Sequence, residues 1–224
     1  MMTRRTWRVA RRYFFPVFVP GILVFILGSR KVGGVLLALA ASIFFFFRDP
    51  ERETARGVLS VYAPADGLVR EVEEVEDETL GRAVRISIFL NLQNVHVNRA
   101  PFGGLVRSLQ EIEGGYTPAL FGGSGDNYRI RTVIDGEFGA YVLVQKAGMI
   151  ARRITPFVGP GETVRSGQRL GVIHFGSRTD VLFPVGSAEV LAERGTKVKA
   201  GMTEIARYRR APEEGTDGRG TPDL

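Results

Sequence analysis

Cysteine is absent from this chain of 224 residues, and histidine occurs only as His96 and His174. The absence of cysteine excludes a disulfide framework, a thiolate nucleophile and a cysteine-based metal site. Two histidines are also too few for a metal centre built on several imidazole ligands, so we expect no metal. Proton transfer near neutral pH therefore rests on very few side chains.

Charge is missing from two stretches near the N-terminus, residues 13–29 and 32–47, which Arg30 and Lys31 separate. Each stretch is short for a transmembrane helix, which typically has about 20 apolar residues. A signal peptide has one apolar run, whereas here a second run follows directly. We therefore predict a basic N-terminus and a two-helix membrane hairpin over residues 1–49. The alternative is a buried helical hairpin of a soluble protein, because core helices reach the same length.

Arginines crowd the residues before the first apolar stretch, at Arg4, Arg5, Arg8, Arg11 and Arg12. Such a cluster favours a cytoplasmic N-terminus, and two membrane spans would return the remaining chain to the cytoplasm. We therefore expect the protein at the inner membrane of the cell, with its larger part on the cytoplasmic side. Pro16 and Pro20 are expected to bend the first helix or to delay its start.

Long helical periodicity is missing after residue 50, where short β-rich runs alternate with turn residues. The candidate strands are residues 58–62, 67–75, 82–91, 104–113, 128–134, 138–146, 169–175, 180–184, 187–192 and 203–208. Within them "RAVRISIFL" (82–90) alternates charged and apolar side chains, as a half-buried strand does. We predict a mainly β, largely antiparallel domain over residues 50–210. Residues 211–224 lack apolar anchors and are predicted to be disordered.

A short pattern, G-x-x-V-x-x-G, occurs at residues 161–167 and again at 195–201. Two such units suggest two similar β corners folded against each other. The arrangement resembles the barrel-sandwich fold of biotinyl and lipoyl domains, and this is the fold class that we predict behind the membrane hairpin. A carrier domain of that type needs a lysine at the hairpin between its halves. Lys146 is not placed there, and Gly176-Ser177 lies between the two units instead.

Three side chains could form a proton-relay set: Asp66 in "YAPADGLV", His96 in "NLQNVHVNRAP" and Ser177 in "HFGSRTD". A nucleophile, a base and an orienting acid can be far apart in sequence and meet only in the fold. Each residue also has a structural interpretation. Asp66 and the Gly176-Ser177 pair are ordinary turn residues, and His96 is a polar residue at the end of an apolar strand. Spacing alone leaves both interpretations open.

The sequence resembles the phosphatidylserine decarboxylases in their short proteobacterial and archaeal form. The matching segments are "APADG" (63–67), "NVHVNRAPFGG" (94–104), "VQKAGMIARRI" (144–154), "GETVRSGQRLGVIHFGSRTDVLFP" (161–184) and "KVKAGMTEIA" (197–206). Together with the apolar N-terminal stretches they cover nearly the whole chain to about residue 208. The pairing of "FGSR-x-D" with "VHVNRAP" is the specific part of the resemblance.

The resemblance implies a zymogen that cuts itself between Gly176 and Ser177. The Ser177 hydroxyl would attack the Gly176 carbonyl while His96, oriented by Asp66, removes its proton. The implied products are chains 1–176 and 177–224, which stay together as a heterodimer that can assemble further. Ser177 would become a pyruvoyl group, the covalent cofactor. Glycine at position 176 leaves open access to the carbonyl that is attacked.

The implied reaction is the decarboxylation of phosphatidylserine to phosphatidylethanolamine and CO2. The pyruvoyl carbonyl would form a Schiff base with the lipid amine and act as an electron sink, as pyridoxal phosphate does elsewhere. His96 is the candidate proton donor to the product. Arg99, Arg152 and Arg153 are candidates for binding the lipid phosphate or the acidic bilayer surface. A membrane hairpin suits a lipid substrate, and no nucleic-acid partner is expected.

Two other functions stay open on the sequence. One is a membrane-tethered, lipoyl-like β adaptor without catalysis, although such adaptors usually carry one anchor and long helical hairpins, and no long soluble helix is expected in this chain. The other is a decarboxylase with the same mechanism that acts on another serine phospholipid. Gln93 stands where long bacterial members often have a second histidine, so a role for that histidine does not transfer. His174 stands where a basic residue is expected, and we assign it a packing role.

Overall fold

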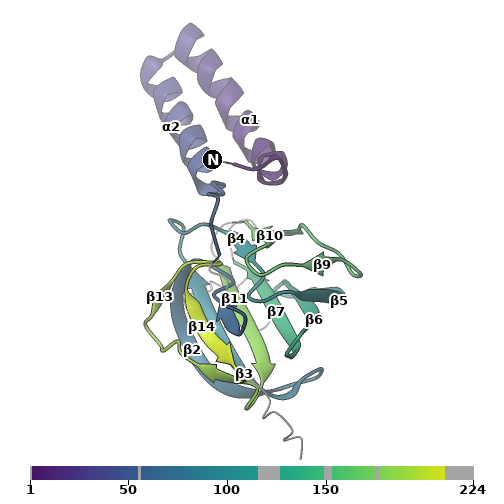
Figure 1. Ribbon diagram of the computed structural model, residues 1–224. Coiled ribbons are helices and arrows are strands. Elements are labelled where there is room, and N and C mark those ends of the chain that lie inside the picture. The colour runs from purple at the N-terminus through teal and green to yellow at the C-terminus, as the bar shows by residue number, and fades with distance from the viewer. Residues whose placement is uncertain (1, 55–56, 116–126, 149–152, 175–176, 210–224) are drawn as a thin grey trace, which may run out of the picture.

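Two helices come first in the chain, and all of the strands follow them. The structure, a computed structural model, describes residues 2–54, 57–115, 127–148, 153–174 and 177–209. Figure 1 shows the helix pair standing above one end of a β-rich domain. The predicted mainly β class with an N-terminal helix pair is thereby confirmed. The predicted disordered tail, residues 211–224, lies outside the described residues.

The helix pair consists of α1 (Arg4–Leu27) and α2 (Arg30–Phe46). α1 begins well before the first apolar stretch and continues through Pro16 and Pro20, so the expectation that these prolines delay its start is wrong. The early start has a local cause, because the Thr3 side chain caps the helix by accepting a hydrogen bond from the Thr6 amide. The Thr6 hydroxyl then donates to Asp49, which ties the first turn to the chain that leaves α2.

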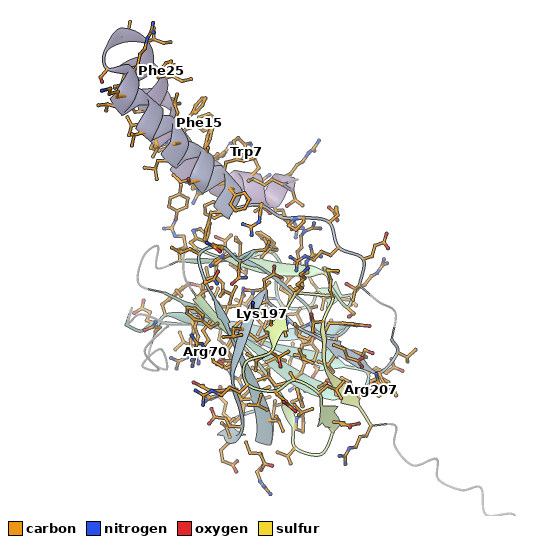
Figure 2. The ribbon with its side chains drawn as sticks, turned by 90° about the vertical axis from the view of Figure 1, so that its left-hand side faces the viewer. Trp7, Phe15, Phe25, Arg70, Lys197 and Arg207 are labelled. Atoms are coloured by element: carbon orange, nitrogen blue, oxygen red, sulfur yellow. The ribbon has the colours of Figure 1, made fainter. Side chains whose placement is uncertain are left out.

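The outer surface of the pair is apolar and exposed. α1 has the length and composition of a helix that crosses a membrane, and few of its residues are buried. Figure 2 shows Phe15 and Phe25 on the part of the pair that extends away from the β domain, with Trp7 nearer to its base. A large exposed apolar surface marks a site of membrane or protein contact. The exposure therefore disfavours the buried hairpin of a soluble protein and is consistent with a membrane anchor.

Fourteen strands are present in the described residues. They are β1 (Ser60–Tyr62), β2 (Gly67–Asp77), β3 (Gly81–Leu90), β4 (Val97–Arg99), β5 (Gly104–Ile112), β6 (Arg129–Gly136), β7 (Gly139–Ala147), β8 (Ile154–Pro156), β9 (Thr163–Val164), β10 (Arg169–Ile173), β11 (Ser177–Pro184), β12 (Ala188–Val190), β13 (Lys197–Val198) and β14 (Glu204–Tyr208). One sheet has the order β13-β2-β3-β11-β7-β6-β5-β9, and two three-stranded sheets have the orders β1-β14-β12 and β4-β10-β8. Every named pairing is antiparallel.

The large sheet is built from two similar halves that extend the repeat seen in the sequence. Residues 63–70 and 100–107 share the pattern A-P-x-x-G-L-V-R, and each opens the long strand of one half. Gly67 pairs with Val198 of one repeat unit, and Gly104 pairs with Val164 of the other. The register then slips at the same place in both halves, between Val69 and Glu71 and between Val106 and Ser108. The similarity of the two β corners is thus confirmed.

The two ends of the large sheet approach each other. β9 and β13 are its edge strands, and the glycines that follow them, Gly167 and Gly201, both have positive φ, which favours glycine. A Cβ atom built on Gly201 would lie 3.4 Å from the Cα of Gly167. The sheet is therefore strongly curled, and the main hydrophobic core, which includes Val69, Val106 and Phe183, fills the inside of the curl.

β11 runs through the middle of this sheet and begins at Ser177. The sequence predicts a break at Gly176-Ser177 and a strand over 180–184. In the structure the strand begins three residues earlier, at Ser177. The alternation of side chains explains the difference. Val181 and Phe183 point into the main core, and Ser177 and Thr179 share their face of the strand. Gly176 lies outside the described residues.

Candidate active site

Ser177 is held at the start of a central strand with its side chain fully buried. It pairs with Leu90 of β3 on one side and with Ala147 of β7 on the other. Its exposed fraction is 0%, and its Oγ has no hydrogen-bond partner among the described residues. A buried hydroxyl without a partner costs free energy, so such a group requires an explanation beyond packing.

His96 is the second buried group with an unused polar atom. Its Nδ1 lies 3.0 Å from the Asn94 carbonyl oxygen, whereas its Nε2 has no partner among the described residues. The ring packs against Phe46 at the end of α2, with ring centroids 4.3 Å apart. Burial lowers the pKa of His96 to about 4, so the imidazole is neutral at pH 7 and Nε2 can accept a proton if Nδ1 carries the hydrogen.

A buried polar contact brings the segments of these two residues together. The Asn98 side chain in β4 donates to the Thr179 hydroxyl in β11 at 3.1 Å and accepts from Gln145 Nε2 at 2.6 Å. His96 and Ser177 each lie two residues before one of these partners, and side chains two apart share a face of an extended segment. The contact therefore turns the face with His96 toward the face with Ser177.

Asp66 lies within electrostatic range of His96 but makes its hydrogen bonds elsewhere. Arg52 donates to both of its carboxylate oxygens, and the Ala200 amide donates to Oδ1 at 2.8 Å. The charge of Asp66 raises the pKa of His96, although by less than burial lowers it. The structure therefore does not show direct orientation of His96 by Asp66, because the Asn94 carbonyl holds Nδ1 and Arg52 holds the carboxylate.

Asp180, the aspartate of "FGSRTD", lies on the face of β11 opposite Ser177, and its contacts there indicate its role. Asp180 is fully buried, accepts a hydrogen bond from the Ser87 hydroxyl and pairs with Lys146 at 2.6 Å. Arg178, on the same face, pairs with Glu71. These contacts link β11 to β2, β3 and β7 on the side away from Ser177. Asp180 is therefore a structural residue that holds the strand of the serine in place.

His174 belongs to the junction between the helix pair and the β domain. Its Nδ1 lies 2.9 Å from the Tyr13 hydroxyl of α1, and its Nε2 lies 3.1 Å from the Thr155 hydroxyl of β8. Burial, and then the nearby charges of Arg153 and Arg12, lower the pKa of His174 to about 4. The packing role that we predicted is consistent with these contacts, but the residue also connects the anchor to the segment that leads to Ser177.

Of the three predicted phosphate-binding arginines, the structure describes Arg99 and Arg153. Arg99 is buried, and its guanidinium donates to the carbonyl oxygens of Gly167 and Pro50 and contacts Asp49 at 3.5 Å. These contacts place Arg99 where the chain that leaves α2 meets the curled sheet, and it shares Asp49 with Arg169. Arg153 is exposed, and Arg152 lies outside the described residues.

Two cavities lie next to the candidate residues. One, of about 450 Å³, includes Asp66 and Asn94 in its wall together with the cations Arg70, Lys197 and Lys199. Figure 2 shows Arg70 and Lys197 on the β domain, apart from the helix pair. The other, of about 520 Å³, is largely apolar and lies where α2 meets Leu92 and Gln93. His96 lines neither cavity but contacts a wall residue of each, Asn94 of the polar one and Phe46 of the apolar one. A polar and an apolar cavity near one residue suit an amphipathic ligand.

Sequence reasoning missed Arg52, Asn98 and the cations of the polar cavity. Asn98 stands in the quoted segment "VHVNRAP", two residues after His96, and the shared face of an extended segment was the signal that could have found it. Arg52 carries no such local signal, because its partner Asp66 is fixed only by the fold.

Fold and site together define a class: a β-sheet protein with an apolar N-terminal helix pair and with a buried serine and histidine, each of which has a polar atom without a partner among the described residues. Comparison with known proteins agrees with this class. The family model for phosphatidylserine decarboxylase matches residues 39–206. Among curated relatives, a phosphatidylserine decarboxylase proenzyme of Streptomyces coelicolor is 46% identical over 80% of this chain and 79% of the relative. One from Thermobifida fusca is 43% identical over 80% of each chain.

An archaeal relative is similar over a longer part of the chain. A protein of Halobacterium salinarum, provisionally named an archaetidylserine decarboxylase proenzyme, is 40% identical over 92% of this chain and 100% of its own length. The chain belongs to the phosphatidylserine decarboxylase family, which confirms the resemblance seen in the sequence.

Proposed function

We propose that this protein decarboxylates phosphatidylserine to phosphatidylethanolamine and CO2, after cutting its own chain between Gly176 and Ser177. Family membership supports the reaction, and the word proenzyme in the names of the relatives supports an activating cleavage. The single observation on the site that carries the proposal is the buried Ser177 hydroxyl without a hydrogen-bond partner among the described residues. A nucleophile that attacks its own backbone must be held close to that backbone and away from water.

In the proposed cleavage, Ser177 Oγ attacks the Gly176 carbonyl carbon and loses its proton to His96 Nε2. The peptide bond is replaced by an ester between Gly176 and the serine oxygen, and the same proton passes to the freed amine. Removal of the Ser177 α-proton then expels the Gly176 carboxylate and leaves dehydroalanine at position 177. Addition of water to this residue releases ammonia and produces the pyruvoyl group. His96 suits the base role because burial keeps its imidazole neutral at pH 7.

The site fits a pyruvoyl group formed in place from Ser177. Burial between β3 and β7 shields position 177 from solvent, and the unused Nε2 of His96 is available as a donor or acceptor. When present, the group serves as an electron sink for the loss of CO2. His96 is our candidate for returning a proton to the product, and the charge of Asp66 stabilises the protonated imidazole that this step requires.

The two chains would stay together without a covalent bond. β11 pairs with β3 over eight residue pairs and with β7 over six, and β14 pairs with β1. Strands of the chain 177–224 therefore form hydrogen-bonded sheets with strands of the chain 1–176. Further assembly of this heterodimer stays a prediction.

We propose that the helix pair anchors the site at the bilayer surface. We propose the inner membrane and its cytoplasmic side, because arginines precede the first apolar stretch and two spans would return the chain to the same side. The apolar cavity beside α2 includes Phe46 in its wall, and the Phe46 ring contacts His96, so this cavity is our candidate for the acyl chains of the lipid.

A second candidate substrate is an ether-linked serine phospholipid of the archaeal type. The name of the Halobacterium salinarum relative and its 40% identity to this chain favour it as an alternative. The adaptor without catalysis loses support, because the family comparison points to an enzyme.

Intact mass spectrometry of the purified protein tests the proposal. We expect two chains split between residues 176 and 177, with a ketone in place of the amine at the start of the second chain. The Ser177→Ala variant should remain a single chain, whereas the matched Ser187→Ala variant should be cleaved as the wild type is. A wild-type protein that stays whole would contradict the cleavage. Incubation of the cleaved enzyme with ester-linked and ether-linked serine lipids then separates the two substrates.

A further inference from the structure

A third cavity lies between the first turns of α1 and the top of the β domain. Its volume is about 270 Å³, which is just below the roughly 300 Å³ where pockets for drug-sized ligands begin. It is therefore large enough for a lipid headgroup but not for acyl chains. Its wall is formed by Arg5, Arg8, Val9 and Arg12 of α1 and by Thr155, Pro156, Phe157 and His174 of the β domain. We call it the arginine cavity.

Helical spacing directs the three arginines into this one cavity. Positions 5, 8 and 12 are separated by three and four residues, so they follow one side of α1. Arg5 Nη1 donates to the Phe157 carbonyl oxygen at 2.7 Å, which fixes α1 above the cavity. Arg11 is also exposed but does not line the cavity, although it is the direct neighbour of Arg12.

The described part of the chain supplies no acidic partner for Arg8 and Arg12 in the arginine cavity. No carboxylate is among the described residues that line it, and no ion pair between described residues includes Arg8 or Arg12. Arg12 and the nearby Arg153 both act on His174 at the back of the cavity, where their charges lower its pKa. Cations that converge on a recess without an acidic partner are arranged for an anion, and arginine binds phosphate with paired hydrogen bonds.

Immersion of the uncharged part of α1 in a bilayer would bring the arginine cavity to the depth of the lipid phosphates. The charged turns of α1 end at Arg12, and residues 13–27 carry no charge. That uncharged part is roughly 22 Å long at 1.5 Å per residue, so the arginines cannot be far from the headgroup layer when it is immersed. Trp7 lies between the arginines in sequence and near the base of the pair (Figure 2), as aromatic residues of the bilayer interface do.

We propose that the arginine cavity binds the phosphodiester of an anionic phospholipid, with Arg8 and Arg12 as its donors. An anionic lipid would then bind at the point where the helix pair meets the segment that leads to Ser177. This inference rests on the membrane position in the proposed function, but it does not depend on the cleavage chemistry.

The test measures lipid binding by the full-length protein in neutral phosphatidylcholine nanodiscs, to which phosphatidylserine or phosphatidylglycerol is added. Native mass spectrometry counts the bound lipids. The variants are Arg8→Gln and Arg12→Gln, and Arg11→Gln is the control with the same charge change on the same helix. We expect Arg12→Gln and Arg8→Gln each to weaken binding of both anionic lipids by about tenfold, and Arg11→Gln by less than about twofold. Equal losses in Arg11→Gln and Arg12→Gln would overturn the proposal, because plain surface charge predicts that result.

Two further arms complete the experiment. Sodium phosphate at constant ionic strength should displace the lipids no better than sodium chloride. Displacement by phosphate alone would identify a site for free anions and overturn the lipid proposal. The mass spectrum of the same samples also reports cleavage at 176/177. Lipid binding with the expected variant pattern in an uncleaved protein would refute the proposed cleavage and leave the arginine cavity supported.

Discussion

The hydroxyl of Tyr13 in α1 lies 2.9 Å from Nδ1 of His174, which stands three residues before Ser177. Nε2 of the same ring lies 3.1 Å from the Thr155 hydroxyl, so both nitrogens of His174 have a partner. The Tyr13 ring is also stacked on Phe47, where α2 ends. The membrane anchor is thus joined through one buried imidazole to the segment that contains the proposed cleavage bond.

We therefore predict that Tyr13→Phe slows self-cleavage. The change removes one partner of a buried ring nitrogen, which costs about 1–3 kcal/mol, and it lets the imidazole rotate. Thr155→Val removes the partner of the other nitrogen and should slow cleavage to a similar extent. The measurement is the rate at which full-length chain disappears after synthesis in the presence of lipid. Phe14→Leu, a neighbouring change that does not touch His174, is the control, and equal rates in Tyr13→Phe and the wild type would contradict the prediction.

The stability of the folded protein should fall as the pH is lowered below about 6.5. The pKa values of His96 and His174 are about 4 in the folded chain, against about 6.5 when unfolded. Between these values the unfolded chain binds more protons, so the free energy of unfolding decreases as the pH falls and is fully recovered above pH 6.5. At pH 5 the expected loss is about 2 kcal/mol for each histidine.

Denaturant unfolding in detergent micelles at pH 7.5 and pH 5 measures this loss. The double variant His96→Gln/His174→Gln should show a much smaller difference between the two pH values. The same difference in wild type and double variant would assign the pH dependence to carboxylates instead.

Breaking the buried pair of Lys146 and Asp180 should destabilise the protein strongly. Lys146→Met leaves the Asp180 carboxylate, which is 1% exposed, without its cation, and such a loss typically costs about 3–5 kcal/mol. The double variant Lys146→Met/Asp180→Leu should recover most of this free energy. The surface pair of Arg82 and Glu74 is the control, because breaking an exposed pair costs less than about 1 kcal/mol. Thermal unfolding of these two variants and of an Arg82→Gln control checks the order, and a similar cost for breaking either pair would show that Asp180 is not a structural residue.

Gly67 and Gly104 occupy equivalent positions in the two halves of the large sheet. Substituting each of them distinguishes an effect on stability from an effect on cleavage. A Cβ atom at Gly67 would lie 2.1 Å from the Phe89 carbonyl oxygen, and one at Gly104 would lie 2.4 Å from the Asp135 carbonyl oxygen. Alanine at either position must therefore push two strands apart, and we expect a loss of about 1–3 kcal/mol in each case. Only Gly67→Ala also shifts the adjacent Asp66, so it should slow self-cleavage more than Gly104→Ala does at equal stability. Parallel measurements of unfolding and cleavage decide this, and equal cleavage rates would argue against a role for Asp66.

Local sequence patterns were sufficient to predict the longer strands. The predicted strands at 67–75, 82–91 and 104–113 correspond to β2, β3 and β5, because alternation of apolar and polar side chains is a property of neighbouring residues. The short strands β4, β8, β9 and β13 were not predicted, since two or three residues show no period. Their pairing is decided by the edges that the longer strands provide.

The features of the site also fall into two groups, those that follow from the sequence and those that depend on the tertiary structure. The sequence by itself determined the helical anchor, the mainly β class and the small set of groups able to move a proton, because these follow from composition and local pattern. Only the tertiary structure decided that Arg52 holds Asp66, that Arg99 joins the anchor to the sheet and that Arg8 and Arg12 line one cavity. These contacts depend on which charged residues the fold brings together from distant parts of the sequence. Asp49 and Arg169, for example, pair at 2.7 Å across 120 positions of sequence, and only the curl of the sheet and the seat of the helix pair bring such partners together.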